Sequence, residues 1–349
     1  MGTKKKTVAV TLILLILFLT ACDMLPASNS SPVPADAGTK GITLFNKDQN
    51  LVTAYIPKEK VHLGQSLGAA KENISVITDS GSVINTTADV YLSGAPMAVH
   101  IPDRDKVIEN VVGIYLWEDF NSVTDTFYDA KSYLDAGEKV MVVLLDGFSL
   151  KQYELAKERE YVTYLSRYFK HEALSVYTPV TNAGFAAMIT GKNPDANGVH
   201  DRSFRKMKVE SIFGYALNKS RRVLLLEGDI KILDTEIEPV LHMDLNRDGD
   251  IDDEIFQTAK MEAQKDYDLI FIHFHGIDDR GHSYGPEALE TMDYIKKIDG
   301  YIEEISSIWN GPMLLTADHG MHKTENGGSH GMCIQEDMIV PYFKKEQRK

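Results

Sequence analysis

The feature that most constrains the fold of this chain is a series of short apolar runs in its C-terminal part. The run KVMVVLLD, residues 139–146, has no polar residue between its ends. Unbroken apolar runs are typical of parallel strands that are buried on both faces of a sheet. Comparable runs occupy residues 223–228, 268–274, 312–318 and 337–343.

Segments with helical spacing lie between these runs. Apolar residues follow a helical stripe in residues 150–169 and again in residues 286–309, where Leu289, Met292 and Ile295 begin the stripe. This spacing predicts helices whose apolar side chains face a core. Strands that alternate with helices predict an α/β fold, in which helices on both faces cover a mostly parallel sheet.

Acidic and imidazole side chains follow three of the predicted strands. They are Asp146 after the first run, Asp278 and His282 after the third, and Asp318 and His319 after the fourth. A single acid at a strand end is more often a turn former or a helix cap, but three such ends are hard to obtain by chance. Ligands of open α/β sheets bind outside the carboxyl ends of the strands. Because mixed sets of carboxylates and imidazoles suit zinc, the pattern predicts a divalent-metal site at this edge.

A threonine lies at the start of a predicted helix of small residues. Thr181 follows a strand-like stretch, and the helix ends at Gly191. Local sequence alone favours Thr181 as the helix N-cap. The free N–H groups of a helix N-terminus also favour a bound phosphate. A hydroxyl becomes a nucleophile when its pKa is lowered, for example by a metal, so the predicted metal site makes Thr181 a candidate nucleophile.

Together these motifs resemble the type I phosphodiesterase/nucleotide pyrophosphatase branch of the alkaline phosphatase superfamily. That branch has a strand followed by Asp-Gly, a Thr ten residues before the Gly of a Thr-Gly pair, then D-x-x-G-H-x-x-G-P, D-H-G-M and a late His-Gly. This chain has every piece in that order: Asp146-Gly147, Thr181 with Gly191, residues 278–286, residues 318–321 and His330-Gly331. The stretch HFHGIDDRGHSYGP also resembles the ethanolamine-phosphate transferases of the same superfamily. The resemblance covers residues 139–343, and it implies an alkaline phosphatase-like sheet.

The resemblance implies two zinc ions, with other divalent metals as alternatives. One ion would be held by Asp146, Asp318 and His319 with Thr181 as a further ligand, and the other by Asp278, His282 and His330. Two metals about 4 Å apart can hold the attacking and leaving oxygens of an in-line displacement. Thr181 would form a phospho-threonine intermediate during hydrolysis of phosphodiester or nucleotide pyrophosphate bonds, with monoesters as a further substrate class.

One position departs from the pattern of the nucleotide pyrophosphatases. In those enzymes an Asn about twenty residues after the nucleophile binds phosphoryl oxygens, and the same distance here leads to Arg202. An arginine can bind phosphate in a bidentate manner, which would favour monoesters or pyrophosphates over diesters. Alternatively, Arg202 pairs with Asp201 or another acid. Asn182 is a second candidate for substrate binding, although helix capping fits it equally well.

Two further groups of polar residues lie near the predicted ligands. His273 and His275 alternate with an apolar residue beside the third strand end, and we expect them to support the ligands or the core. Residues 244–252 follow the start of a calcium-binding loop, with a Gly at its sixth position. The acidic and amide side chains of this loop are Asp244, Asn246, Asp248, Asp250 and Asp252. Position twelve is Ile255 instead of Glu, so an acidic helix-capping turn is the alternative to a calcium site.

The first residues predict the compartment. Lys4, Lys5 and Lys6 precede a short apolar run, and Ala21 comes directly before Cys22, as in a secretory signal. The segment resembles the lipobox of bacterial lipoproteins, which implies cleavage before Cys22 and a lipid on its thiol and amino group. The alternative is an uncleaved anchor helix, but the run is shorter than the ~20 residues of a membrane span. We expect a lipid-anchored protein on the extracytoplasmic face of the cell membrane.

These observations divide the chain into four parts: a signal peptide (1–21), a flexible tether (22–40), a small β-rich domain of unknown role (41–135) and an alkaline phosphatase-like domain (136–349). The net charge of −14 disfavours nucleic-acid partners. The expected partners are a phosphate-ester substrate, either a small molecule or a head group, and the membrane. A hydrolase is the first interpretation. The alternatives are a phosphoethanolamine-type head-group transferase and a non-catalytic, metal-binding surface lipoprotein.

Overall fold

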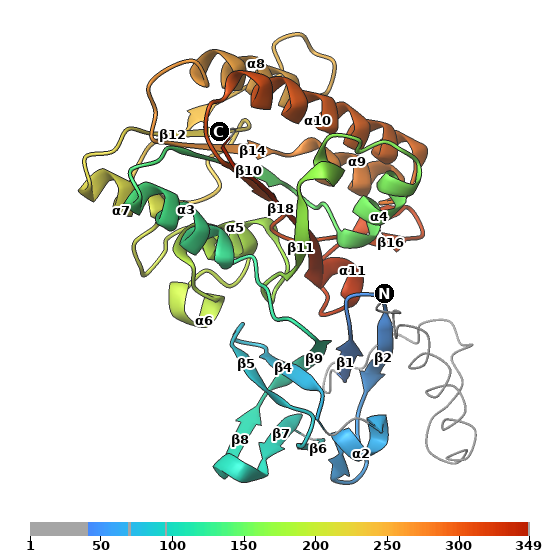
Figure 1. Cartoon of the computed structure of the whole chain (residues 1–349). Coiled ribbons are helices and arrows are strands. Elements are labelled where there is room, and N and C mark those ends of the chain that lie inside the picture. Colours follow the sequence, from blue (N-terminus) through green and yellow to red (C-terminus); the bar gives the residue numbers. More distant parts are fainter. Residues whose placement is uncertain (1–40, 69–70, 95, 348–349) are drawn as a thin grey trace, which may run out of the picture.

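The computed structural model describes residues 41–68, 71–94 and 96–347, which form an N-terminal β-rich part and a C-terminal α/β part (Figure 1). The predicted signal peptide, the predicted tether and the lipidation site Cys22 lie outside the described residues. Within the described ranges, no helix combines the length and apolar character that a membrane span requires.

A seven-stranded sheet forms the centre of the α/β part, with the order β11-β18-β15-β10-β14-β12-β13. Its strands are β10 (Val140–Leu145), β11 (Phe169–Leu174), β12 (Val223–Glu227), β13 (Val240–Leu241), β14 (Leu269–Phe274), β15 (Met313–Thr316) and β18 (Ile339–Lys345). Neighbouring strands are parallel except where β18 pairs with β15 and β11. Each of the five predicted apolar runs contributes one of these strands, so the mostly parallel sheet is confirmed.

Helices cover both faces of this sheet (Figure 1). On one side α3, α5 and α7 contact one another, and on the other side α10 contacts α4, α8 and α9. The helices are α3 (Asp125–Asp135), α4 (Leu150–Glu158), α5 (Thr181–Thr190), α6 (Pro194–Asn197), α7 (Ile212–Asn218), α8 (Asp252–Glu262), α9 (Gly276–Tyr284), α10 (Leu289–Ile308) and α11 (Gln335–Met338). A hairpin of β16 (His322–Thr324) and β17 (Gly327–Ser329) lies after β15. Every side chain of β10 and β14 is buried, as expected for central strands.

Two helix predictions need correction. The predicted helical stripe at 150–169 is helix only as far as Glu158, because Glu160 adopts a left-handed conformation with φ of 57°. In α10 the predicted stripe is buried from Met292 onward, but Leu289 is 64 % exposed. Leu289 is the first residue of the helix, so its side chain lies ahead of the turns that pack against the core.

The β-rich part has a core of its own and contains two sheets. The first has the order β2-β1-β9-β4-β5 and the second the order β3-β6-β7-β8. Their strands are β1 (Ile42–Phe45), β2 (Asn50–Tyr55), β3 (Val61–His62), β4 (Asn73–Thr78), β5 (Val83–Thr87), β6 (Tyr91–Ser93), β7 (Ala98–Ile101), β8 (Lys106–Glu109) and β9 (Val111–Trp117), and α2 (Leu63–Leu67) follows β3. The predicted β-rich region is thus present. Its strands end at Trp117, and α3 contacts β10 and β15 of the α/β part, ahead of the predicted boundary at residue 136.

The two parts meet at α11 and at β9. The side chain of Asn50 donates to Glu336 Oε2 at 2.6 Å and accepts from the Gln335 backbone N–H at 2.8 Å. At β9, a Cβ atom added to Gly113 would lie 2.4 Å from Cys333 Sγ. Gly113 therefore allows the segment that follows His330 to pack directly on the β-rich part.

Candidate active site

The carboxyl ends of three adjacent strands place the predicted ligands at one edge of the sheet. Leu145 at the end of β10 lies opposite Phe274 of β14, and Leu144 lies opposite Thr316 of β15. Asp146 follows β10 directly, and its backbone N–H donates to Phe274 O. Asp278 and His282 lie in the first and last turns of α9, which follows β14. Asp318 and His319 lie in the loop between β15 and β16, and His330 directly follows β17.

The first predicted ligand set comes together. His319 Nε2 lies 3.3 Å from Asp146 Oδ1 and 3.4 Å from Asp318 Oδ2, and all three side chains are buried. These three residues are one of the groups in the described chain whose ligand atoms are close enough to share an ion. The arrangement agrees with the ligand set that the resemblance implies.

The second predicted set lies directly beside the first. Asp278 Oδ2 is 3.2 Å from His282 Nε2, and Asp278 Oδ1 is 3.8 Å from His330 Nε2. Asp278 and His330 also form a close group with His319, whose ring stacks on that of His330 at 3.8 Å between centroids. All six predicted ligands therefore belong to one continuous cluster.

Backbone carbonyl groups orient the three predicted histidine ligands. Nδ1 of His319 lies 2.9 Å from Gly320 O, Nδ1 of His282 lies 3.0 Å from Gly328 O, and Nδ1 of His330 lies 2.8 Å from Pro179 O. A carbonyl oxygen only accepts, so each Nδ1 carries a hydrogen and Nε2 is the nitrogen that each ring directs toward the cluster. Histidines that ligate metals are oriented in this way in most proteins.

The carboxylates supply the strongest indication of a bound cation. One oxygen of each predicted aspartate ligand is buried without a hydrogen-bond partner among the described residues, namely Asp146 Oδ1, Asp278 Oδ1 and Asp318 Oδ2. Leaving such atoms unpaired in the interior is costly unless a cation compensates. Burial and the charge of Asp146 raise the pKa of Asp318 to about 7. The residues present therefore fit a site for divalent ions.

The pKa values of two of the histidines shift in opposite directions in this cluster. Although burial disfavours its charged form, the carboxylates of Asp318 and Asp146 raise the pKa of His319 to about 9. Burial and the nearby His319 lower the pKa of His330 to about 4. A neutral His330 is a ready metal ligand, because its Nε2 lone pair is free of a proton.

Thr181 is the first residue of α5 and not its N-cap. Val180 occupies the cap position, and no side chain caps the helix. The hydroxyl instead lies 3.4 Å from His319 Nε2, at the metal cluster. The small residues of α5 allow this approach, because a Cβ on Gly184 would lie 2.3 Å from the backbone oxygen of Asp318. The structure thus places Thr181 beside the predicted metal ligands and not at the helix cap, and its role as a nucleophile stays a prediction.

The two candidate substrate residues differ in position. Arg202 is exposed, and its Nη2 donates to His330 Nε2 at 2.7 Å, so it reaches the cluster instead of pairing with Asp201. Asn182 is buried, and its amide nitrogen donates to the backbone oxygens of Phe204 and Ile232. These contacts give Asn182 a role in joining two loops. Substrate binding by either residue stays a prediction.

The residues 244–252 form a turn whose acids are largely held by donors of the protein. Asp244 accepts from the N–H groups of Arg247, Asp248 and Gly249, and Asn246 contacts Asp248. Asp250 pairs with Lys297 and accepts from Tyr294, while Asp252 accepts from the N–H groups of His275 and Gly276. Through these bonds the turn supports α9 and α10. Calcium binding at this turn stays a prediction.

One buried acid beside the cluster was not singled out from the sequence. Glu227 ends β12, is fully buried, and its Oε1 lies 3.7 Å from His273 Nδ1. His273 Nε2 in turn lies 3.1 Å from Asp146 Oδ2. The sequence pattern that identified Asp146, an acid at the carboxyl end of an apolar run, is also present in the run at 223–228. His273 supports a predicted ligand, as expected.

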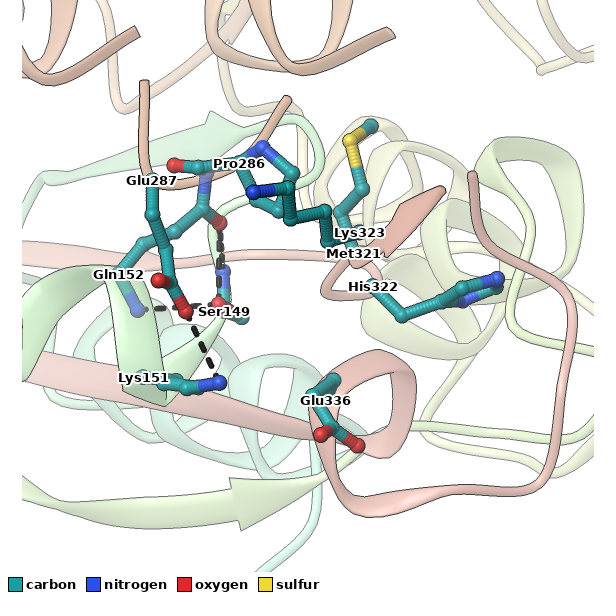
Figure 2. Close-up of a pocket in the computed structure, with 9 residues that line it drawn as sticks. All are labelled: Ser149, Lys151, Gln152, Pro286, Glu287, Met321, His322, Lys323 and Glu336. Carbon is teal, nitrogen blue, oxygen red and sulfur yellow. Dashed lines mark hydrogen bonds and ion pairs between the residues drawn. The ribbon is translucent and has the colours of Figure 1, made fainter. Parts of the chain in front are cut away.

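A separate pocket of about 160 Å³ lies beyond Met321, where Ser149, Gln152 and Pro286 form one wall and His322 another (Figure 2). An ion pair of 2.9 Å between Lys151 and Glu287 borders it (Figure 2). None of the six predicted ligands lines this pocket. The candidate active site is thus the cluster at the strand ends.

Comparisons with known proteins identify a family that resembles part of this chain. Residues 226–340 match the family described as type I phosphodiesterase/nucleotide pyrophosphatase. This stretch contains the predicted ligands Asp278, His282, Asp318, His319 and His330, whereas Asp146 and Thr181 lie before it. Over these residues the resemblance seen in the sequence is confirmed. The match supports a phosphoryl-transfer enzyme as the class of protein that the fold and the site define.

Relatives by sequence are similar over a short stretch. The chain is 34 % identical to GPI ethanolamine phosphate transferase 1 of Mus musculus over 94 residues, which is 25 % of this chain and 10 % of that protein. It is 38 % identical to the corresponding protein of Yarrowia lipolytica over 93 residues, covering 23 % of this chain and 10 % of the relative. The aligned stretch thus spans about a tenth of the length of these relatives.

Solved structures with a similar arrangement include the C-terminal periplasmic domain of a phosphoethanolamine transferase from Campylobacter jejuni. It has a TM-score of 0.45 and 13 % identity, covering 60 % of this chain and 79 % of that chain. A murine ectonucleotide pyrophosphatase/phosphodiesterase 5 in complex with AMP has a TM-score of 0.42 and 17 % identity, covering 54 % of this chain and 58 % of that chain.

Proposed function

We propose that this protein is a metal-dependent enzyme that hydrolyses phosphate esters through a phospho-threonine intermediate on Thr181. The observation that carries the proposal is the position of the Thr181 hydroxyl, 3.4 Å from His319 Nε2, in the cluster of six predicted ligands. Three buried carboxylate oxygens without partners in that cluster support divalent ions beside the hydroxyl.

The mixed set of aspartates and histidines favours zinc. One ion would be held by Asp146, Asp318 and His319. The other would be held by Asp278, His282 and His330. When bound, such ions lower the pKa of a nearby hydroxyl and neutralise phosphoryl oxygens. The residues of this chain supply the nucleophile, hold it in place and bind the phosphoryl group.

Thr181 performs the displacement. After its hydroxyl loses a proton to solvent, Oγ1 attacks phosphorus, and the ester oxygen of the substrate leaves with its bonding electrons. Water then cleaves the bond between phosphorus and Oγ1, which releases the product and restores the hydroxyl. The first N–H groups of α5 have no capping side chain, so they are available for a phosphoryl oxygen.

Arg202 is the proposed second contact for the phosphoryl group. Its guanidinium already lies 2.7 Å from His330 Nε2 and is exposed toward solvent. A fork of N–H donors at this place suits a phosphoryl group with two or three unesterified oxygens. Diesters, pyrophosphates and monoesters are therefore all candidate substrates, and Arg202 favours the last two.

Purified protein tests the proposal through metal content and hydrolysis together. We expect about two zinc ions per chain and release of nitrophenol from 4-nitrophenyl phosphate or bis(4-nitrophenyl) phosphate. Thr181→Ala should lower kcat by a factor on the order of 10³ or more, with the metal content retained. Thr190→Ala is the matched control, because Thr190 lies at the other end of α5, where its hydroxyl donates to Ala186 O and accepts from the N–H of Lys192. Full activity of Thr181→Ala contradicts the mechanism.

A second function is supported by the sequence relatives, which are named as ethanolamine phosphate transferases. A transferase would use the same nucleophile but pass the group to an alcohol instead of water. The partition is measurable: with added ethanolamine or glycerol as acceptor, a hydrolase forms mainly free phosphate, and a transferase forms mainly the new ester. Zinc without turnover of any ester would favour a non-catalytic, metal-binding surface lipoprotein.

We also propose that the protein is attached to the extracytoplasmic face of the cell membrane through a lipid on Cys22. The support is the sequence pattern alone, a charged start, a short apolar run and a small residue before the cysteine. Cys22→Ala should move the protein from the membrane fraction to the soluble extracytoplasmic fraction. Retention of this variant in the membrane fraction contradicts the proposed attachment.

A further inference from the structure

The two carboxylate oxygens of Asp146 have different surroundings. His273 Nε2 lies 3.1 Å from Oδ2. An ionised carboxylate only accepts hydrogen bonds, so His273 Nε2 carries the hydrogen. Oδ1 has no hydrogen-bond partner among the described residues and faces His319 Nε2 at 3.3 Å. Oδ2 is thus held by the protein, and Oδ1 is directed toward the predicted ligands.

His275 approaches the same oxygen as His273. The backbone N–H of Gly228 donates to His275 Nε2 at 3.2 Å, which places the hydrogen of a neutral imidazole on Nδ1. His275 Nδ1 lies 3.6 Å from Asp146 Oδ2. This distance is longer than a hydrogen bond, but the N–H dipole still attracts the carboxylate. Both imidazoles therefore favour one rotation of the Asp146 carboxylate.

Other contacts hold the His273 ring on the side that faces away from Asp146. Glu227 Oε1 lies 3.7 Å from His273 Nδ1, and neither atom has another partner among the described residues. The other oxygen of Glu227 accepts from the N–H of Ile232 at 3.3 Å. The ring of Phe185 packs against His273 at 5.5 Å between centroids. The imidazole consequently has little freedom to turn away from Asp146.

We propose that His273, backed by Glu227 and assisted by His275, is a positioning residue that turns Asp146 Oδ1 toward the metal site. This proposal rests on the proposed function, which supplies the metal. It adds which oxygen of Asp146 faces the metal and which residues orient that oxygen. Asp146, His273 and His275 are themselves a close group of possible ligand atoms. The hydrogen positions argue against an ion there, since the two nitrogens that face Asp146 both carry hydrogen.

Two substitutions of His273 separate the roles of its nitrogens. In His273→Gln the amide N–H comes near the position of Nε2, so the donor to Asp146 is kept. In His273→Asn the amide lies near the position of Nδ1 and is too short to reach Asp146. We expect two zinc ions in the wild type and in His273→Gln under a zinc buffer. His273→Asn and His273→Leu should bind one of the two ions roughly 10- to 100-fold more weakly, as measured by chelator competition.

His242 supplies the matched control. It is buried, and it contacts the backbone oxygen of Glu227 at 2.8 Å and the hydroxyl of Thr258 at 2.9 Å. His242→Asn and His242→Gln should lower the unfolding midpoint without changing either zinc affinity. If the His273 variants fail to fold, His275→Gln provides the second test, because it removes the Nδ1 donor at a partly exposed position. It should weaken the same ion by a smaller factor.

The outcomes distinguish failure of the proposed metal site from failure of the proposed role of His273. A wild type that binds no divalent metal removes the proposed function and this inference with it. A wild type with two ions and equal zinc affinities in His273→Gln and His273→Asn overturns the inference alone. Selective weakening of one ion in His273→Asn, with recovery in His273→Gln, supports it, because a purely structural role of His273 would not distinguish the two amides.

Discussion

At the scale of single residues, hydrogen bonds decide which atoms face the site. A backbone carbonyl holds Nδ1 of each predicted histidine ligand, which directs Nε2 toward the cluster. Each predicted aspartate ligand likewise has one carboxylate oxygen that finds no hydrogen-bond partner in the described part of the chain. Arg202 is the exception, because its exposed guanidinium is held through His330 alone among the hydrogen bonds seen here. Arg202 is therefore the residue on which substrate preference can depend.

Arg202→Ala should raise KM for 4-nitrophenyl phosphate roughly 10- to 100-fold, because a charge-assisted pair contributes about 1.5–3 kcal/mol. The KM for bis(4-nitrophenyl) phosphate should change less, since a diester has fewer charged oxygens. Steady-state kinetics on both esters give the comparison. Arg205→Ala is the control, because Arg205 bonds Lys231 O and no predicted site residue. Equal effects of Arg202→Ala on both esters would contradict a role in distinguishing them.

At the scale of elements, the site depends on helices that approach the strand ends closely. Gly184 brings α5 against the backbone of Asp318, and a Cβ on Gly147 would lie 2.7 Å from Asp278 Oδ1. On the opposite side, the 244–252 turn connects α8, α9 and α10 through Asp250 and Asp252. Although burial raises it, hydrogen bonds from Lys297 and Tyr294 bring the pKa of Asp250 below its ordinary value.

This shift predicts how the stability of the turn depends on pH. A carboxyl group whose folded pKa is lowered stabilises the protein above its unfolded pKa and loses that contribution as the pH falls through the folded pKa. Asp250→Asn should therefore cost about 2 kcal/mol at pH 7, with the difference from wild type shrinking below about pH 4. Urea unfolding at several pH values measures it, with the exposed Glu290→Gln as control. A difference that grows on acidification would contradict the pairing.

At the scale of the whole molecule, the β-rich part supports the segment that carries His330. Asn50 bonds α11, and Asp337 of α11 accepts from the N–H of Met332 and bonds His322 Nδ1 at 2.8 Å. Cys333, three residues after His330, packs on Gly113 of β9. The contacts give the β-rich part, whose role is not evident from the sequence, a structural connection to the candidate active site.

A double-mutant cycle tests this connection. Gly113→Ala should destabilise the protein by about 1–3 kcal/mol, because the added methyl group would overlap Cys333 Sγ. Combining it with Cys333→Ala removes the overlap, so the double variant should be more stable than the sum of the single effects predicts. Urea unfolding midpoints of the four proteins give the coupling. Strict additivity would show that the two residues do not touch.

The sequence predicted the parts of this molecule that follow from local patterns. The apolar runs predicted the strands, and their terminal acids predicted which side chains share an edge, because parallel strands end together. The end of α4 at Glu158 was not predictable, since the half-buried Tyr161 and the buried Val162 continue the apolar spacing without being helical. The contact of Arg202 with His330 joins positions 128 residues apart, so tertiary structure alone reveals it. Glu227 was missed although it carried the same signal as Asp146.

The central claim is that Thr181 receives the phosphoryl group, and trapping the intermediate tests it most directly. The protein is mixed with bis(4-nitrophenyl) phosphate, quenched with acid during turnover, digested and mapped by mass spectrometry. We expect a nitrophenyl-phosphoryl adduct on the peptide that contains Thr181, present in the wild type and in Thr190→Ala and absent in Thr181→Ala. Turnover by the wild type with the adduct on another residue, or undiminished turnover by Thr181→Ala, would show that Thr181 is not the nucleophile.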